Sequence, residues 1–473
     1  MAENFIGRKS ELQVLQNCME SNESEFIAIY GRRRVGKTFL VRQTLEDHFI
    51  FYAEGILNED TDVQLRNFNK EIVRYGGSAL LPATNWIDAF ENLNSLIENA
   101  ETSSKKVIFL DEVSSMATAH SGFLSALAHF WNRWVSLRGD VLLIICESAT
   151  SWIIKNIVGD KGGLHNRLTR QILLQPFTLK ECEEFFQTQC IPLTRYQMAE
   201  CYMILGGIPY YLKLMKRELS LPQNIDLLYF TQDAPLRNEY KFLYDSLFSN
   251  PDNHIKIIEA LAKVGHGLTR GEIADKTGLA ASGRLTKTLG ELIDCGFVRE
   301  YLAYGKKERD RLYQLIDPFT LFHLHFHDKR RVYSEDYWLH FYTTSAHATW
   351  SGYAFERVCL QHTAQIRKAL GVSGVLTEVY SWRSKTSVPG AQIDLVIDRA
   401  DRVVNLCEVK YSSTPFKITK AYAEKLREKR AAFLEETRKV KSAQTTLITT
   451  FGLVRNEYSN EILSQVQLDD LFL

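Results

Sequence analysis

Two groups of residues in this sequence have the types and the spacing that chemistry on phosphates requires. The first is GRRRVGKT, in which Gly31, Gly36, Lys37 and Thr38 fit the pattern G-x-x-x-x-G-K-[ST]. Glycines there let backbone N–H groups curve around phosphate oxygens, the lysine reaches the terminal phosphates, and the hydroxyl binds magnesium. The pattern follows the apolar run FIAIY and precedes a helix start. It therefore predicts a loop that binds the phosphates of a nucleotide.

Two acidic residues follow a second apolar run, in KKVIFLDEVSSM. The carboxyl ends of parallel strands meet at one edge of a sheet, so Asp111 and Glu112 are expected beside the glycine loop. Asp111 is the candidate for the magnesium shell, and Glu112 is the candidate for polarising an attacking water. The alternative is an acidic turn that water solvates.

The second group lies near the C-terminus. In NLCEVKYS, Glu408 and Lys410 are two residues apart and share one face of the predicted strand. An adjacent strand, within GAQIDLVIDR, can place Asp394 beside them. Convergent carboxylates bind a hard cation such as Mg²⁺, which activates water toward a phosphodiester. Lys410 would stabilise the developing charge. The alternative is a structural set of charges that neutralise one another.

Length and composition limit the possible classes of protein. The 473 residues suggest about three domains at roughly 150 residues each. Lys+Arg and Asp+Glu both number 57, so contact with nucleic acid would need a local basic surface. The first residues, MAENFIGRKS, lack a secretory pattern, and the apolar runs are too short for a bilayer. Eight scattered cysteines suit reduced thiols, so we expect a cytoplasmic protein without a membrane partner.

The order of the expected helices and strands divides the chain into four predicted parts. They are a phosphate-binding core at 1–180, a helical lid at 181–248, a winged helix at 249–334 and a C-terminal α/β domain at 335–473. In the third part Thr269 and Glu272 form a capping-box pattern, and Arg284 and Lys287 lie on the next helix. Such a helix could enter a DNA groove, or the same domain could contact protein.

The front of the chain resembles a family of prokaryotic, archaeal-type P-loop ATPases of the AAA-like and STAND-like kind. FIGRKSEL at 5–12, GRRRVGKT and the acidic pair carry the resemblance. It implies that ATP and Mg²⁺ are the cofactors. Besides the residues above, the implied nucleotide contacts are Arg34, Val35 and Phe39.

Three further positions extend this resemblance. Ser148 is the candidate sensor of the γ-phosphate, although Glu147 replaces the glycine that relatives have before it, which puts the local geometry in question. Arg167 or Arg170 is the candidate arginine finger, acting on its own phosphate or on that of a neighbouring subunit in a homo-oligomer. Pro209, in GGIPYY, matches the lid of signalling ATPases, or simply starts a helix.

The tail resembles the PD-(D/E)xK nuclease superfamily, as does the C-terminal domain of the same ATPase family. This resemblance implies that Asp394 and Glu408 bind metal, that Lys410 is catalytic, and that Glu356 from an earlier helix is an accessory ligand. Ile393 stands before Asp394 where the superfamily pattern names a proline.

The sequence therefore predicts an α/β protein with four parts. They are a parallel-sheet P-loop ATPase, a helical lid, a winged helix and a restriction-endonuclease-like domain. The expected function is ATP binding and hydrolysis that controls Mg²⁺-dependent cleavage of DNA. The alternative is an ATPase switch that binds DNA or protein without cutting.

Overall fold

The computed structural model of the chain describes residues 5–77, 82–102, 104–159, 162–248, 250–326, 336–384, 391–438 and 441–473. The chain forms two compact units. Unit 1 comprises Met1–Pro176 with Ser246–Phe248, and unit 2 comprises Phe177–Asp245 with Ser249–Leu473. Within the described ranges, no helix is long and apolar enough to cross a membrane.

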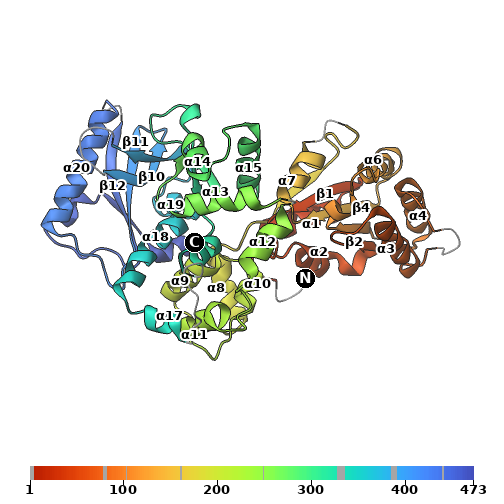
Figure 1. Ribbon diagram of the computed structural model, residues 1–473, viewed down its shortest axis with the longest axis horizontal. Coiled ribbons are helices and arrows are strands. Elements are labelled where there is room, and N and C mark those ends of the chain that lie inside the picture. Colours follow the sequence, from red (N-terminus) through yellow and green to blue (C-terminus); the bar gives the residue numbers. More distant parts are fainter. Residues whose placement is uncertain are drawn as a thin grey trace. The chain divides into compact units, whose positions relative to one another are not determined.

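Unit 1 is built on a five-stranded parallel sheet in the order β2-β3-β4-β1-β5 (Figure 1). The strands are β1 (Glu25–Tyr30), β2 (Phe49–Glu54), β3 (Lys106–Asp111), β4 (Val141–Glu147) and β5 (Arg170–Leu173). Strands β1, β3 and β4 are buried along their whole length, because helices cover both faces of a parallel sheet. This explains why their sequences are continuous apolar runs rather than alternating ones.

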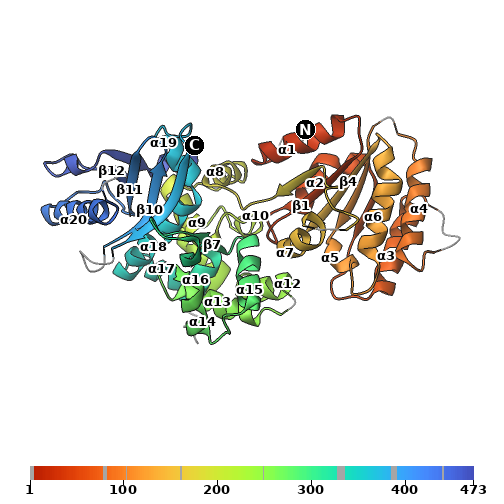
Figure 2. The same cartoon turned by 90° about the horizontal axis from the view of Figure 1, so that it is seen from above.

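The helices of unit 1 lie on both faces of this sheet. They are α1 (Lys9–Glu20), α2 (Lys37–Leu45), η1 (Glu46–His48), α3 (Thr61–Arg74), α4 (Trp86–Asn99), α5 (Val113–Met116), α6 (Phe123–Arg133), η2 (Val135–Leu137), α7 (Thr150–Ile153) and η3 (Ile154–Val158). One core joins Phe26 of β1 and Leu143 of β4 to Phe68, Phe90 and Phe130 of α3, α4 and α6. Figure 2 shows α1 and α2 on the opposite side of the sheet from these three helices.

Unit 2 begins with helices and continues with a small antiparallel sheet. Its first helices are α8 (Leu179–Thr188), α9 (Arg195–Leu205), α10 (Pro209–Lys213), α11 (Leu221–Ile225), η4 (Asp226–Phe230) and α12 (Glu239–Leu247), of which the last two residues belong to unit 1. Then come α13 (Asp252–Ala262), β6 (Leu268–Thr269), α14 (Arg270–Thr277), α15 (Gly283–Asp294), β7 (Val298–Tyr301), η5 (Glu308–Asp310), β8 (Leu312–Leu315) and α16 (Pro318–Phe326). The strand order is β6-β8-β7. The capping box predicted at Thr269 and Glu272 is confirmed.

The last part of unit 2 is a mixed sheet in the order β13-β12-β11-β10-β9. Its elements are α17 (Tyr337–Phe341), α18 (Ser345–Gln361), α19 (Thr363–Ala369), β9 (Thr377–Arg383), β10 (Gln392–Arg399), β11 (Val403–Lys410), α20 (Lys420–Glu436), β12 (Ser442–Thr449), η6 (Ser459–Glu461), β13 (Ser464–Gln467) and η7 (Leu468–Phe472). Strands β9, β10 and β11 are antiparallel neighbours, whereas β11, β12 and β13 run parallel. The winged-helix and nuclease-like assignments of these two parts stay predictions.

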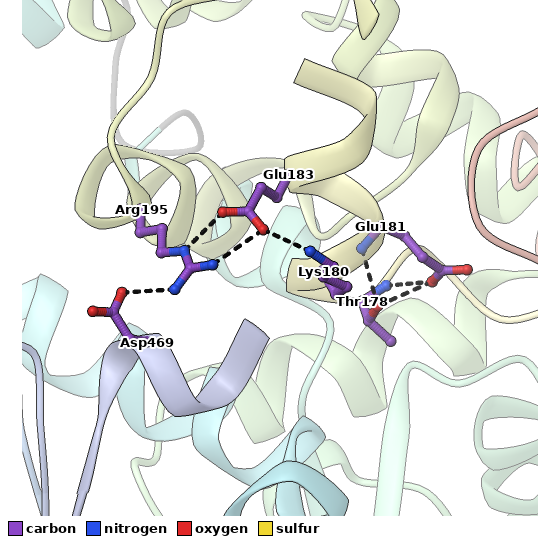
Figure 3. Close-up of polar contacts among 6 residues, drawn as sticks. All are labelled: Thr178, Lys180, Glu181, Glu183, Arg195 and Asp469. Atoms are coloured by element: carbon purple, nitrogen blue, oxygen red, sulfur yellow. Dashed lines mark hydrogen bonds and ion pairs between the residues drawn. The ribbon is translucent and has the colours of Figure 1, made fainter. Parts of the chain in front are cut away.

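Helix α9 is tied to the C-terminal turn of the chain. Arg195 donates from Nε to Glu183 of α8 at 2.7 Å and from Nη1 to Asp469 of η7 at 3.1 Å (Figure 3). Its guanidinium carbon lies 4.8 Å from the centre of the Phe472 ring. Lys180 also donates to Glu183, at 3.0 Å. The hydrogen bond from Arg195 lowers the pKa of Glu183, so this buried carboxyl stays charged.

Helix α9 also contacts α18 and the residue directly after strand β11 of the last sheet. Glu200 is fully buried and is hydrogen-bonded to Nε2 of His347 on α18 at 2.9 Å. The ring of Tyr196 stacks on that of Tyr411, directly after β11, with the centroids 4.9 Å apart. Helix α9 therefore packs into the C-terminal part of unit 2 along much of its length.

The β7 segment continues along the edge of the last sheet. Ala303 forms a parallel bridge with Ser381 of β9, and the Tyr304 amide donates to the Ser381 carbonyl at 2.7 Å. The Tyr304 ring packs against Tyr380 and against Phe433 of α20, with centroids 5.4 and 5.1 Å away. The small sheet and the last sheet of unit 2 are thus joined by backbone pairing.

A buried histidine makes the stability of unit 2 depend on pH. His362 bonds through Nδ1 to the Val358 carbonyl at 2.8 Å, and its Nε2 accepts from the Leu179 amide at 3.1 Å. The bond to Leu179 requires the neutral ring, because a protonated ring has no nitrogen lone pair left to accept a hydrogen bond. Burial lowers the pKa of His362 to about 4 from 6.5. Its stabilisation is therefore complete above pH 6.5 and is lost as the pH falls toward 4.

We expect unit 2 to lose about 2 kcal/mol of stability between pH 7 and pH 5 through this histidine. Hydrogen exchange of peptides that contain Leu179 measures the loss. His362→Gln should be less stable at pH 7 but should lack this pH dependence. His340→Asn, at an exposed position, is the control. An unchanged pH profile in His362→Gln would contradict the assignment.

Candidate functional site

The glycine loop connects β1 to α2 through backbone that requires glycine. Gly31 has φ +145°, and a Cβ on it would lie 2.3 Å from the Leu174 carbonyl oxygen. Gly36 precedes α2 with φ +94°. Between them Arg34 has φ 71°, and Val35 is buried with its carbonyl accepting from Arg8 at 3.4 Å. The loop is therefore curved and held, as the sequence predicts.

Lys37 is buried in this loop and is 6% exposed. Its Nζ donates to the carbonyl oxygens of Gly31 and Arg32 at 2.9 and 3.0 Å, and to Oγ of Ser148 at 3.1 Å. These are neutral acceptors, and a phosphate oxygen is a stronger one for an ammonium group. Lys37 is thus placed to exchange them for phosphate.

Thr38 and Asp111 form the pair expected to bind magnesium. The Thr38 hydroxyl donates to Oδ2 of Asp111 at 2.6 Å. Asp111 is 2% exposed at the end of β3, and burial raises its pKa, against the Thr38 hydrogen bond that lowers it. A hydroxyl and a buried carboxylate supply oxygen ligands of the kind that a hard divalent cation takes. These residues would hold Mg²⁺, which would supply charge neutralisation to bound phosphates.

Glu112 and Ser148 meet beside this pair. The Ser148 hydroxyl donates to Oε1 of Glu112 at 2.7 Å while it accepts from Lys37. Both line a cavity of about 520 Å³, together with Arg33, Tyr52 and other polar residues. Strand pairing thus brings the loop lysine, the sensor candidate and the water-polarising candidate into one hydrogen-bonded chain.

Glu147, which the sequence marks as unusual, ends β4 and is 1% exposed. Its two oxygens accept from the Ser114 amide at 2.6 Å and from the Ala149 amide at 2.8 Å. Burial, together with the charge of Glu112, raises the pKa of Glu147 to about 7. The glutamate is accommodated because both oxygens find backbone donors.

Four other predicted residues lie apart from this chain of contacts. Phe39 is 56% exposed and stacks on Phe5 with the centroids 5.7 Å apart. Arg167 and Arg170 are both exposed, as a finger toward another subunit would need to be. Pro209 begins α10 in unit 2, so its role toward the nucleotide stays a prediction.

In the C-terminal sheet, Glu408 is held by helix α20 rather than by Lys410. Its carboxylate accepts from Lys429 at 2.5 Å and from the Tyr422 hydroxyl at 3.2 Å. Lys410 lies on the same side, with its Nζ 5.2 Å from the centre of the Tyr422 ring. The pairing of Glu408 with Lys429 was not predicted, because it depends on how α20 packs on the sheet.

Glu356 and Asp394 face a second set of cations. Burial raises the pKa of Glu356 to about 7, and the nearby charge of Asp394 adds to this effect. Two arginines interact electrostatically with Asp394: Arg299 of β7, which is partly exposed, and Arg357 of α18, which is buried. Desolvation lowers the pKa of both. Asp394 also accepts from Gln392 at 2.5 Å. Neither arginine was predicted, although Arg357 directly follows Glu356 in a helix that carries no other Asp, Glu, Lys or Arg.

In the described part of the chain, no group of three or more His, Cys, Asp or Glu side chains is arranged to hold a metal ion. Around the last sheet, Glu408 pairs with Lys429, and Glu356 interacts electrostatically with Asp394, Arg357, Lys410 and Glu408. The metal role of these three carboxylates therefore stays a prediction.

Comparison with known proteins identifies the front of the chain. Residues 5–215 match the family described as an ATPase domain predominantly from Archaea. An uncharacterised protein of Methanocaldococcus jannaschii is 25% identical over 441 residues, which cover 92% of this chain and 94% of the relative. An uncharacterised ATP-binding protein of the same organism is 46% identical over 43 residues, covering 9% of this chain and 73% of that protein.

Among solved structures, a Walker-type ATPase of Pyrococcus abyssi aligns with a TM-score of 0.48 and 17% identity. The alignment covers 68% of this chain and 97% of that one. From residue 5 to residue 215, the chain is an ATPase domain of the archaeal type.

Proposed function

We propose that the chain binds ATP with Mg²⁺ at the glycine loop of unit 1 and hydrolyses it. The observation that carries this proposal is the unbroken set of contacts from Lys37 through Ser148 to Glu112, beside the Thr38–Asp111 pair. The side chains proposed to bind phosphate, to sense it, to polarise water and to hold Mg²⁺ are thus gathered at one edge of the sheet.

The contacts suggest an order of events. Without a phosphate, Lys37 is held by its own loop and Glu112 by the Ser148 hydroxyl. A triphosphate would draw Lys37 and Ser148 to its oxygens, because charged acceptors compete better than carbonyls. Glu112 would then lose its donor and be free to orient and polarise water in the adjoining cavity.

We also propose that the nucleotide state controls the C-terminal part of the chain through helix α9. The family match runs to residue 215, but the chain divides into compact units after residue 176. The last part of the ATPase domain, including α8 and α9, therefore folds within unit 2. Arg195, Tyr196 and Glu200 of α9 contact η7, Tyr411 and His347. A lid that moves with nucleotide would move with these contacts.

For the C-terminal sheet we keep two candidate activities. The first is Mg²⁺-dependent cleavage of DNA by Asp394, Glu408 and Lys410, with Glu356 as an accessory ligand. The adjacency of β10 and β11 and the electrostatic interaction of Glu356 with Asp394 support it. DNA would then be the substrate, with the region of α13–α15 and β7–β8 as a winged helix that holds it.

The second candidate is a non-cleaving switch that binds DNA or protein. The ion pair of Glu408 with Lys429 favours it, as does the electrostatic interaction of Arg299 and Arg357 with Asp394. In both versions Arg167 could act as a finger between copies of the chain.

Removing the loop lysine tests the nucleotide site. Lys37→Ala should weaken ATP binding about 100-fold, because two or three charge-assisted hydrogen bonds to phosphate are lost. Titration calorimetry with ATP and Mg²⁺ measures the change. Lys155→Ala, an exposed lysine of the same unit, should bind normally. Equal affinity in both variants would rule out this loop as the site.

Removing the carboxylate of Glu112 separates binding from turnover. Glu112→Gln should bind ATP normally and hydrolyse it about 100-fold more slowly, since a general base is lost. The bound triphosphate should then persist, which chromatography of the bound nucleotide detects. Glu91→Gln is the exposed control. Normal turnover in Glu112→Gln would assign the role elsewhere.

Plasmid cleavage decides between the two candidate activities. Purified protein is incubated with supercoiled plasmid, ATP and Mg²⁺ or Mn²⁺. Nicking that Asp394→Ala abolishes and the exposed control Glu435→Ala retains would support the nuclease. Cleavage equal in wild type and Asp394→Ala would refute this site, and no cleavage with either metal would leave the switch.

A further inference from the structure

The two loops that carry Glu112 and Ser148 are joined by one side chain. Strands β3 and β4 are parallel neighbours, so the loops after them leave the same edge of the sheet. Glu147 lies at the end of β4 and accepts from the Ser114 amide with Oε2 and from the Ala149 amide with Oε1. Ser114 is two residues after Glu112, and Ala149 directly follows Ser148.

The geometry of this contact is rigid. A carboxylate is planar and its oxygens are a fixed distance apart, so accepting from both amides limits how far these two amides can move relative to each other. Glu147 is 1% exposed, so water does not compete for either oxygen. A glycine here would have no side-chain acceptor for these two amides.

Glu112 needs such restraint because its backbone is strained. It has φ 49°, a conformation unfavourable for a non-glycine residue unless its surroundings enforce it. On one side Gly55 lies so close that a Cβ on it would be 2.4 Å from the Glu112 carbonyl oxygen. On the other side, the bond from Ser114 to Glu147 holds the turn that follows Glu112.

We propose that Glu147 is a positioning residue for ATP hydrolysis, which sets Glu112 and Ser148 at the separation that water activation and phosphate sensing require. This inference rests on the proposed ATPase function. Both oxygens of Glu147 accept hydrogen bonds from backbone amides. The residue therefore acts on the reaction through its neighbours Glu112 and Ser148.

The test compares turnover with binding. Glu147→Ala and Glu147→Gly should lower kcat about 30-fold while the Kd for ATP changes less than about threefold, because misplacing a catalytic group affects the transition state selectively. Glu147→Gln keeps one acceptor oxygen and should lose only about fivefold in kcat. The matched control for kcat is Glu25→Ala, which removes a buried glutamate at the start of β1, away from the edge of the sheet where Glu147 lies.

A combined variant identifies the route of the effect. If Glu147 acts through Glu112 and Ser148, adding Glu147→Ala to a variant that carries Glu112→Gln and Ser148→Ala should slow turnover by less than about threefold. A full further 30-fold loss would overturn the proposal. Wild-type kcat in Glu147→Ala would also overturn it, as would equal losses in binding and turnover.

Hydrogen exchange keeps the inference testable if the wild type hydrolyses no ATP, which would refute the proposed function alone. Glu147→Ala should then speed exchange in peptides covering 112–116 and 148–150, while the rest of unit 1 keeps its protection. Glu147→Gln supplies the same measurement should Glu147→Ala fail to fold. Unchanged exchange in these two loops would overturn the positioning role.

Discussion

The parallel pairing of β3, β4 and β1 is the constraint on which the nucleotide site depends. Parallel strands end at one edge, so the residues after each strand meet there although they are up to 117 positions apart (Gly31 to Ser148). Lys37 could not reach Ser148, nor Ser148 reach Glu112, if any of these strands were shifted by two residues. These strands are fully buried apolar runs because helices cover both faces of the sheet.

In unit 2, a few buried polar side chains link segments of the chain that are far apart in sequence. Glu200, His362 and Arg357 are each buried by more than nine-tenths, and each links segments that are far apart in sequence. Groups of this kind tolerate little displacement, because a broken bond leaves a buried donor or acceptor unsatisfied. Helix α9 carries one of them into the C-terminal part of the chain. A displacement of α9 would therefore either be opposed by these contacts or move the C-terminal part of unit 2 with the helix.

The sequence was most informative where chemistry is local. The glycine loop, the strand that ends at Asp111 and the capping box at Thr269 each depend on residues within a few positions, and the structure has them as predicted. The partner of Glu408 could not be predicted, since Lys429 reaches it only through the packing of α20. Glu147 was recognised as a departure from relatives, but its two amide donors follow from the pairing of β3 with β4. Arg299 approaches Asp394 from β7, about a hundred residues earlier.

The bridge between Ala303 and Ser381 has a consequence for how the protein can be divided. Strand β9 is the last strand of its sheet, and an uncovered strand edge is a template for pairing with other molecules. The segment after β7 covers part of that edge, and the Tyr304 ring covers apolar surface beside it. A fragment cut before residue 336 would expose the edge to self-association. The C-terminal sheet therefore depends on the segment after β7 to cover part of its edge, and it is not an independent domain in this respect.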